Sequence, residues 1–293
     1  GAPGFRQWRR VVHFGSRSTA TGIITEVAMN MNDLVVARVM GFGPAAILSR
    51  AQGVMNLFHR ESLGAVRSVA FPAFARVHRA GGDLEAAHVE SLGGVTAAGW
   101  TFYGFVAIFP LEILRFLFGP QWDAAAPLVP IFSLAGAMAA VWSLVSSVLL
   151  ATGRVDLNMR AELVVQPLRI LLLIGVVLYL RNLAGYAWTF ALVFGVCIPV
   201  LFWFKQKIVP TAVVPMFRIL SRSAIATACA LVAPVAVKLF VPGPISVPVL
   251  LSAGFCTAAS WVLAIVLVGH PLATHLPWVR NVLGRSRIPR TSA

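Results

Sequence analysis

The sequence predicts an all-α integral membrane protein, a bundle of about eight transmembrane helices. Of the 293 residues, 58% are hydrophobic and only 12% are charged, whereas a soluble domain has roughly 25% charged residues. The mean hydropathy is +0.83, and the apolar residues gather in runs long enough to cross a bilayer. The net charge of +14 does not indicate a nucleic-acid-binding protein, because the basic residues interrupt apolar runs and do not form one basic face.

Eight membrane-length segments follow one another, and the links between them are too short to hold a separate soluble domain. They lie near residues 12–33, 45–74, 88–110, 125–150, 160–180, 183–204, 220–240 and 247–269. We expect three parts in the chain. They are a six-helix lobe over residues 1–210, two additional helices over 211–270 and a basic tail over 271–293.

The distribution of Lys and Arg predicts the orientation. Eight spans leave both termini on one side, and the segments on that side hold fifteen Lys and Arg, against three in the loops on the other side. Because basic residues concentrate on the cytoplasmic side, we expect both termini to be cytoplasmic. The chain is then a multi-pass protein of the cell inner membrane.

Three of the predicted helices carry a polar stripe when residues are placed at ~100° intervals around the helix axis. The stripes consist of Thr19, Glu26, Asn30 and Asp33 in the first span, Ser49, Gly53, Asn56, Arg60 and Arg67 in the second, and Asn158, Glu162, Gln166 and Arg169 in the fifth. Arg50 lies at the edge of the second stripe, and Pro167 is expected to bend the fifth helix.

Two interpretations of the stripes remain open. The polar groups could pair inside the bundle, for example Glu26 with an arginine, and so hold the helices together. They could instead line a hydrated cavity, which we favour because ionisable groups in a membrane usually mark a pathway or a site. The second span carries three arginines and one glutamate, an excess that suits an anionic ligand, because guanidinium groups bind phosphate in a forked geometry.

Four segments in order resemble one family of transporters. They are "DLVVARVMGFGPAAILSRA" (33–51), "VAFPAFARV" (69–77), "LFGPQWDAAAPLVPIFSL" (117–134) and "LLATGRVDL" (149–157). They are similar to segments of polysaccharide and oligosaccharide exporters, the Wzx-like polysaccharide transport branch of the MOP flippase superfamily. The resemblance covers residues 10–205. Its glycines and prolines fit turns at helix ends, as at Gly119-Pro120 and Gly153-Arg154.

The resemblance implies a fold of two six-helix lobes around a central cavity that alternates its access. This chain matches the second lobe plus two C-terminal helices. We therefore expect a first lobe to precede Gly1 and to be a partner of this chain in the same protein.

The resemblance also implies a function. The family moves undecaprenyl-pyrophosphate-linked oligosaccharide to the outer leaflet for polysaccharide or lipopolysaccharide (O-antigen) synthesis. On this chain the diphosphate would lie near Arg60 and Arg67, with Arg50 or Arg169 nearby. The sugars would contact Asn30, Asn56 and Gln166. Glu26 and Asp33 are candidate carboxylates for ion coupling, and structural pairing is an equally good account of them.

Two alternative functions remain. A multidrug-type antiporter of the same superfamily often carries cations, which an arginine-rich cavity fits poorly. A membrane-embedded glycan polymerase or ligase usually needs a large outer loop. The longest outer loop here, 111–124, offers only Glu112, Arg115 and Asp123. We therefore expect a transporter and no enzyme.

We expect neither a metal nor a cofactor. The three cysteines, Cys197, Cys229 and Cys256, lie inside apolar runs without a metal-binding spacing, and the six histidines form no metal-binding pattern. The expected partners are the lipid-linked oligosaccharide, membrane lipids and the first lobe, without nucleic acid.

Overall fold

The structure is a computed structural model that describes residues 19, 23, 34–241, 243 and 245–275. The predicted first span at 12–33 lies almost entirely outside the described residues, and its candidates Glu26, Asn30 and Asp33 are all outside them. The same holds for the basic tail beyond residue 275. Over the described residues the regular structure is helical. The elements are α2 (Phe42–Asn56), η2 (Leu57–Ser62), α3 (Leu63–Arg79), α4 (Leu84–Ile108), α5 (Pro110–Phe118), η3 (Pro120–Leu128), α6 (Val129–Trp142), α7 (Val145–Ala151), α8 (Val155–Tyr179), α9 (Leu183–Gln206), α10 (Val213–Phe240), α11 (Val247–Leu267) and η4 (Pro271–His275).

Within the described residues, six helical segments are long and apolar enough to cross a membrane, which confirms the expected all-α, multi-pass architecture. They are Leu84–Ile108, Pro120–Ala151, Val155–Tyr179, Leu183–Gln206, Val213–Phe240 and Val247–Leu267. Five of the predicted spans agree with these segments to within a few residues. The predicted 220–240 span begins earlier, at Val213.

Among the predicted spans that the structure describes, the second, 45–74, differs most from the structure. It is helical, but it is not among the six apolar segments, and its helical course runs from Phe42 to Arg79 through α2, η2 and α3. Pro72 lies inside α3 and does not end it. The middle piece, η2, is a π-helix, whose wider turn accommodates an extra residue and changes which faces the following residues present.

Two glycine turns expected from the sequence are present. Gly119 (φ 92°) separates α5 from η3, and Gly153 (φ 76°) separates α7 from α8. Both backbones lie in the left-handed region, which costs a residue with a Cβ far more than it costs glycine. These turns fix where the long helices begin.

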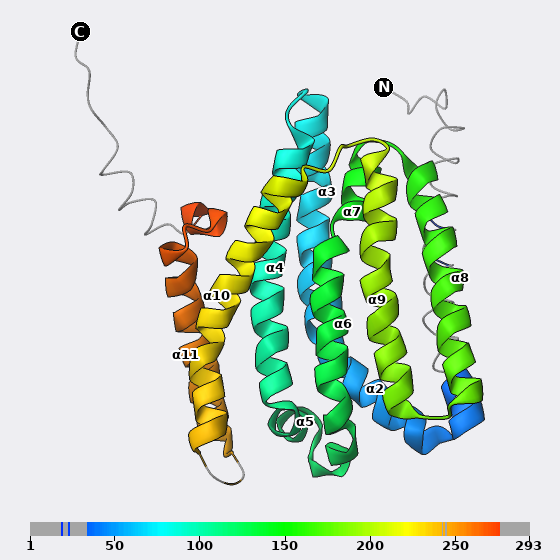
Figure 1. Ribbon diagram of the computed structural model, residues 1–293, viewed down its shortest axis with the longest axis vertical. Helices are drawn as coiled ribbons and strands as arrows, with labels where there is room; N and C mark the ends of the chain where they lie inside the picture. The colour runs from blue at the N-terminus through cyan, green and yellow to red at the C-terminus, as the bar shows by residue number, and fades with distance from the viewer. Residues whose placement is uncertain (1–18, 20–22, 24–33, 242, 244, 276–293) are drawn as a thin grey trace, which may run out of the picture.

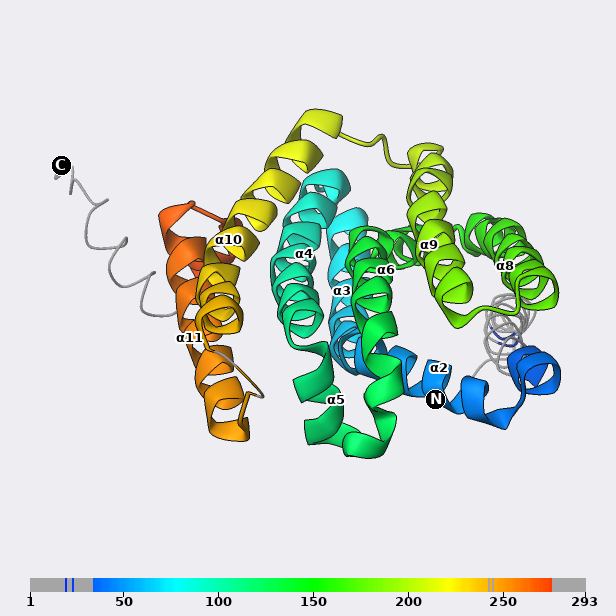
Figure 2. The same ribbon diagram turned by 60° about the horizontal axis from the view of Figure 1, so that its bottom comes forward.

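The long helices stand in a row (Figure 1). At one edge lie α10 and α11, which we call the accessory pair. α10 packs on α4, α4 on α6, α6 on α9 and α9 on α8, so α8 closes the row at the far side. Figure 2 shows α11 outside α10 and α3 beside α4 and α6. The largest apolar core lies where α2, η3, α6 and α9 meet, and it contains Leu48, Leu128, Phe132 and Phe190.

A seam of small residues on α4 holds the accessory pair. A Cβ added at Gly104 would lie 2.3 Å from a terminal methyl group of Leu231 of α10, so this leucine packs directly against the glycine and would have to move to admit a larger residue. Two hydroxyl contacts cross the same seam, Thr96 to Ser223 at 3.0 Å and Thr101 to Thr227 at 3.2 Å. In a membrane, small residues and hydroxyl bonds of this kind are the main source of specific helix association.

Candidate functional site

A cavity of 180 Å³ lies between α3, the α6–α7 junction, α8 and α9. We call it the arginine cavity. It brings together three of the predicted substrate-binding residues, Arg67, Gln166 and Arg169, with Glu162 of the same polar stripe. Its lining residues are His59, Arg67, Trp142, Ser143, Ser146, Glu162, Val165, Gln166, Arg169, Phe194, Cys197 and Leu201.

The position of Arg67 depends on the break between α6 and α7. α6 ends at Trp142 and α7 begins at Val145, so the carbonyl of Ser143 lies at a helix end. Carbonyls at helix ends lack intrahelical donors and carry partial negative charge, which favours a cation. The Nε of Arg67 donates to this carbonyl at 3.2 Å, and the rest of the guanidinium remains at the cavity.

α8 contributes the opposite wall. Glu162, Gln166 and Arg169 share one face because they are spaced three and four residues apart. Gln166 donates its amide to Glu162 at 2.7 Å, which occupies one carboxylate oxygen. Pro167 lies inside this helix and does not end it.

Several buried polar atoms of this cavity have no partner among the described residues. Arg169 is 5% exposed, yet its Nε and Nη2 donate to nothing there, and the Oε1 of Gln166 and the Nδ1 of His59 are likewise unpaired. Buried polar atoms are nearly always hydrogen-bonded in native proteins. Unpaired donors facing a cavity therefore indicate a place for water or for a ligand.

The charge in the cavity is predominantly positive. Two guanidinium groups, Arg67 and Arg169, line it together with one carboxylate, Glu162. The walls between them include the aromatic rings of Trp142 and Phe194, which pack on each other at 5.8 Å between centroids. A low-dielectric wall strengthens the field of charges that it surrounds, so the arrangement favours an anionic group.

The structure separates the other arginine candidates from this cavity. Arg60 is exposed, and Arg50 lies over the rings of Phe118 and Trp122, at 5.3 and 4.9 Å from their centroids. The sequence placed Arg60 and Arg67 on one face of a regular α-helix. The π-helix at Leu57–Ser62 interrupts that regular spacing, so only Arg67 reaches the cavity.

Asn56 also lies outside the arginine cavity. It is half-buried at the end of α2, and its Oδ1 is buried without a partner among the described residues. Its side-chain oxygen can therefore accept a hydrogen bond from a ligand or water at the junction of α2 and the π-helix. It does not line the cavity that contains Arg169.

Several lining residues had no signal in the sequence that marked them as part of a site. His59 is 9% exposed and follows Phe58 in the π-helix, where periodicity does not predict its direction. Cys197 lies on α9, and its position inside an apolar run did not mark it as part of a site. The Ser143 carbonyl is a backbone group, which side-chain patterns cannot reveal. Across the described residues, no group of three or more His, Cys, Asp or Glu is arranged to hold a metal ion.

Comparison with protein families gives one match. Residues 3–127 match a family described as "Polysaccharide biosynthesis protein". The match contains the first two motifs recognised in the sequence and part of the third, and it includes α3, which carries Arg67. No curated protein and no solved structure shows significant similarity to the chain.

Proposed function

We propose that the chain forms the C-terminal lobe of a lipid-linked oligosaccharide flippase. The proposal is supported by the match of residues 3–127 to a family described as "Polysaccharide biosynthesis protein" and by the resemblance of the sequence to polysaccharide exporters. The substrate is a glycan on a polyprenyl diphosphate, which crosses from the cytoplasmic to the outer leaflet. The six apolar helices supply the membrane-embedded scaffold that such a transporter requires.

The arginine cavity carries the proposal. An Arg guanidinium forms forked, charge-assisted hydrogen bonds to phosphate oxygens, and Arg169 has two nitrogens free of partners among the described residues. At 180 Å³ the cavity is smaller than the roughly 300–1,000 Å³ of pockets that enclose whole drug-sized ligands. We therefore place one phosphate group in it, and the sugars and the prenyl chain outside.

The other arginines have a place in the same scheme. Arg60 is exposed on the π-helix next to His59, so it can meet a substrate that lies against the outside of α3. Such a substrate would lie between this lobe and the first lobe, whose presence we infer from the family resemblance. Arg50, held over two aromatic rings near η3, is the weakest of the four as a phosphate ligand.

The charge of the cavity separates this proposal from the antiporter alternative. A cationic drug would meet two arginines and a single carboxylate, Glu162, which already accepts from Gln166. Like charges at close range oppose binding, so a cationic substrate is disfavoured. The proposal includes no covalent step, and we assign no catalytic residue.

The test uses the full-length protein in a strain that lacks its own flippase, with glycan export as the readout. Replacement of Arg67 or Arg169 by Ala removes hydrogen bonds to a charged group that contribute about 1.5–3 kcal/mol each, which predicts a roughly ten- to hundredfold loss of export. Replacement by Lys should retain part of the activity, because the charge remains while the fork is lost.

The matched control is Arg79→Ala. Arg79 also lies on α3 and also donates its Nε to a backbone carbonyl, that of Ala75 at 3.2 Å, but it is exposed and outside the cavity. We expect this variant to export normally. Membrane abundance is measured for every variant. Wild-type export by an abundant Arg67→Ala, Arg169→Ala double variant would refute the proposal.

A further inference from the structure

The π-helix between α2 and α3 brings a histidine to the arginine cavity. His59 lies in this π-helix, Leu57–Ser62, and lines the cavity together with Arg67 and Arg169. Its side chain is 9% exposed, and its Nδ1 has no hydrogen-bond partner among the described residues. Because π-helices are rare and occur frequently at functional sites, the reason for this one bears on the role of His59.

The π-helix compensates for a mismatch between the apolar faces of α2 and α3. The buried residues are Leu48, Ala51, Val54 and Met55 on α2, and Leu63, Ala70 and Phe74 on α3. At ~100° per residue, these two faces would point about 110° apart along an uninterrupted α-helix. One extra residue in a wider turn offsets about 100° of this difference. The π-helix therefore lets both apolar faces turn toward the rest of the bundle.

Two consecutive rings of the π-helix pack on different helices. The ring of Phe58 packs on Tyr103 of α4, at 5.6 Å between centroids. The ring of His59 packs on Trp142 of α6 and on Phe194 of α9, at 6.3 and 6.4 Å between centroids. Since Trp142 and Phe194 are themselves walls of the arginine cavity, this packing fixes the imidazole at the cavity.

Tyr103 holds the start of the π-helix. Its hydroxyl donates to the carbonyl of Met55 at 3.3 Å. In a regular α-helix that carbonyl would accept from the N–H of residue 59, and a side chain that bonds to the helical ladder is a known cause of helix irregularity. Tyr103 is 2% exposed, and a Cβ added at Gly136 of α6 would lie 2.7 Å from its hydroxyl oxygen, so the phenol packs directly against this glycine.

We propose that His59 is a third ligand of the anionic group in the arginine cavity, and that Tyr103 is the positioning residue that holds it there through the π-helix. In the tautomer that carries its proton on Nδ1, the imidazole donates to a phosphate oxygen, while Arg67 and Arg169 supply the positive charge. The inference rests on the proposed function, because the anionic group is the phosphate of the proposed substrate.

Packing alone gives a different account of His59. Aromatic rings contact the imidazole from α6 and from α9, so a phenylalanine would fill the same place. Packing does not explain the polar edge of the ring, because an unpaired buried nitrogen costs free energy that a phenylalanine would not cost. The two accounts therefore make opposite predictions for His59→Phe.

The binding experiment uses the full-length protein in detergent and inorganic diphosphate as the probe, with titration calorimetry as the measurement. His59→Phe keeps a ring and removes Nδ1, so affinity should fall roughly ten- to hundredfold, as expected for one hydrogen bond to a charged group. His59→Asn keeps an amide N–H near the position of Nδ1 and should retain part of the affinity. Wild-type affinity in His59→Phe, or no binding of diphosphate by the wild type, would overturn the proposal.

The positioning role of Tyr103 is tested by combining variants. Tyr103→Phe removes only the hydroxyl, and affinity should fall because the π-helix loses its bond at Met55. If Tyr103 acts through His59, Tyr103→Phe should have little further effect on affinity in a His59→Phe protein. A hydroxyl with only a general structural role would lower affinity by the same factor in both backgrounds, and that result would overturn the positioning role.

The matched control is Thr101→Val. Thr101 also lies on α4, and its hydroxyl also contacts another helix, at 3.2 Å from the hydroxyl of Thr227 on α10. In the row of helices, α10 lies on the side of α4 opposite to α6 (Figure 1). We expect the control to bind diphosphate like the wild type. A loss equal to that of Tyr103→Phe would show that any lost hydroxyl on α4 has this effect, and would contradict the assignment of Tyr103.

Glycan export in the strain without its own flippase separates this inference from the proposed function. If the protein exports no lipid-linked sugar but its binding of diphosphate depends on His59, the proposed function fails and the histidine site stands. If the protein exports and an abundant His59→Phe variant exports like the wild type, the proposed function stands and the inference fails.

Discussion

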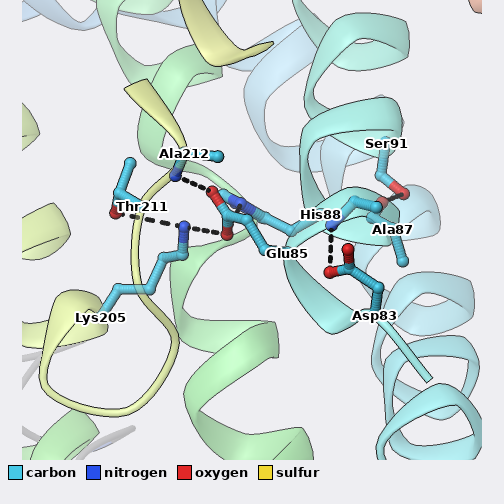
Figure 3. A network of polar contacts seen from close by, with 9 residues as sticks. Asp83, Glu85, Ala87, His88, Ser91, Lys205, Thr211 and Ala212 are labelled. Carbon is cyan, nitrogen blue, oxygen red and sulfur yellow. Dashed lines mark hydrogen bonds and ion pairs between the residues drawn. The ribbon is translucent and has the colours of Figure 1, made fainter. Parts of the chain in front are cut away.

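The arginine cavity and the cluster formed by Glu85 of α4 and Lys205 of α9, the Glu85–Lys205 latch, are both buried polar clusters between helices (Figure 3). They differ in the balance of hydrogen-bond donors and acceptors. In the latch, the carboxylate of Glu85 accepts from Lys205 and from Ala212, so the opposite charges meet within the protein. In the arginine cavity, two guanidinium groups share one carboxylate, and Arg169 retains unpaired nitrogens within the described residues. The difference indicates that the charges of the latch are compensated by each other, whereas in the arginine cavity the described residues supply more cationic than anionic groups.

The same comparison extends to the opposite end of the bundle. There Arg115 pairs with Asp123 at 2.6 Å, and Lys238 pairs with Glu112 at 2.6 Å. The guanidinium of Arg115 is close to Asp123, which raises the pKa of Arg115 above its usual value. These two cations are thus each compensated by a carboxylate within the protein.

The largest effect on stability is expected when only one side of the latch is removed. Glu85→Gln leaves the ammonium of Lys205 buried without a counter-charge, and breaking a buried pair in this way costs about 3–5 kcal/mol. Lys205→Met should cost less, because Glu85 borders a water-accessible cavity. Thermal unfolding in detergent measures both, and equal losses in the two single variants would contradict the asymmetry.

The next largest effect concerns Arg169 and separates stability from transport. Arg169→Met removes a buried cation that has unpaired nitrogens within the described residues, so the free energy of unfolding should stay the same or rise. Export should nevertheless fall by roughly ten- to hundredfold, because one charge-assisted contact to phosphate is lost. A destabilisation as large as that of Glu85→Gln would show that Arg169 is paired inside the protein, and would remove the contrast between the two clusters.

A smaller effect is expected at His270, which attaches η4 to α4 and α10. The N–H of Leu272 donates to Nδ1 at 3.2 Å, so Nε2 carries the proton and donates to Ser223, also at 3.2 Å. Burial, followed by the nearby charge of Arg222, lowers the pKa of His270 below its usual value of 6.5. The neutral form is therefore favoured in the folded state.

The pH dependence follows from that direction. Above pH ~6.5 the histidine is neutral in both states, and the attachment has its full stability. Below that value the detached segment binds a proton more readily than the attached one, so the attachment weakens as the pH falls. The measurement is hydrogen exchange of the backbone amides of residues 266–275 in the wild type and in His270→Gln at each pH. As the pH falls, the protection of these amides should decrease in the wild type and not in the variant. Parallel exchange in the two proteins would contradict the prediction.

The smallest effect is expected at the Glu112–Lys238 pair. Glu112 is 10% exposed, but its lysine is 42% exposed, so loss of the carboxylate leaves a cation that water can reach. Ion pairs with exposed partners contribute about 0–1 kcal/mol. Glu112→Gln should therefore change the melting temperature little and leave export unchanged. A loss comparable to that of Glu85→Gln would show that the exposure of the lysine does not decide how much these pairs contribute to stability.

Much of the fold could be predicted because its signals are local. Apolar runs of membrane length gave the positions of α4, α6, α8, α9, α10 and α11, and glycines gave the turns at Gly119 and Gly153. The polar stripe on α8 was also visible, since Glu162, Gln166 and Arg169 obey helical spacing. The stripe on α2 and α3 was only partly correct, because a π-helix at Leu57–Ser62 breaks the regular spacing that the prediction assumed.

The sequence by itself determined the membrane class of this protein, its helix order, its turns and the residue types available for a site. Only the tertiary structure decided which of those residues meet. Arg67 bonds a carbonyl 76 residues away, and Lys205 bonds a carboxylate 120 residues away. Such contacts depend on how whole helices pack, and helical periodicity specifies the face that a residue occupies but not the helix that the face will meet.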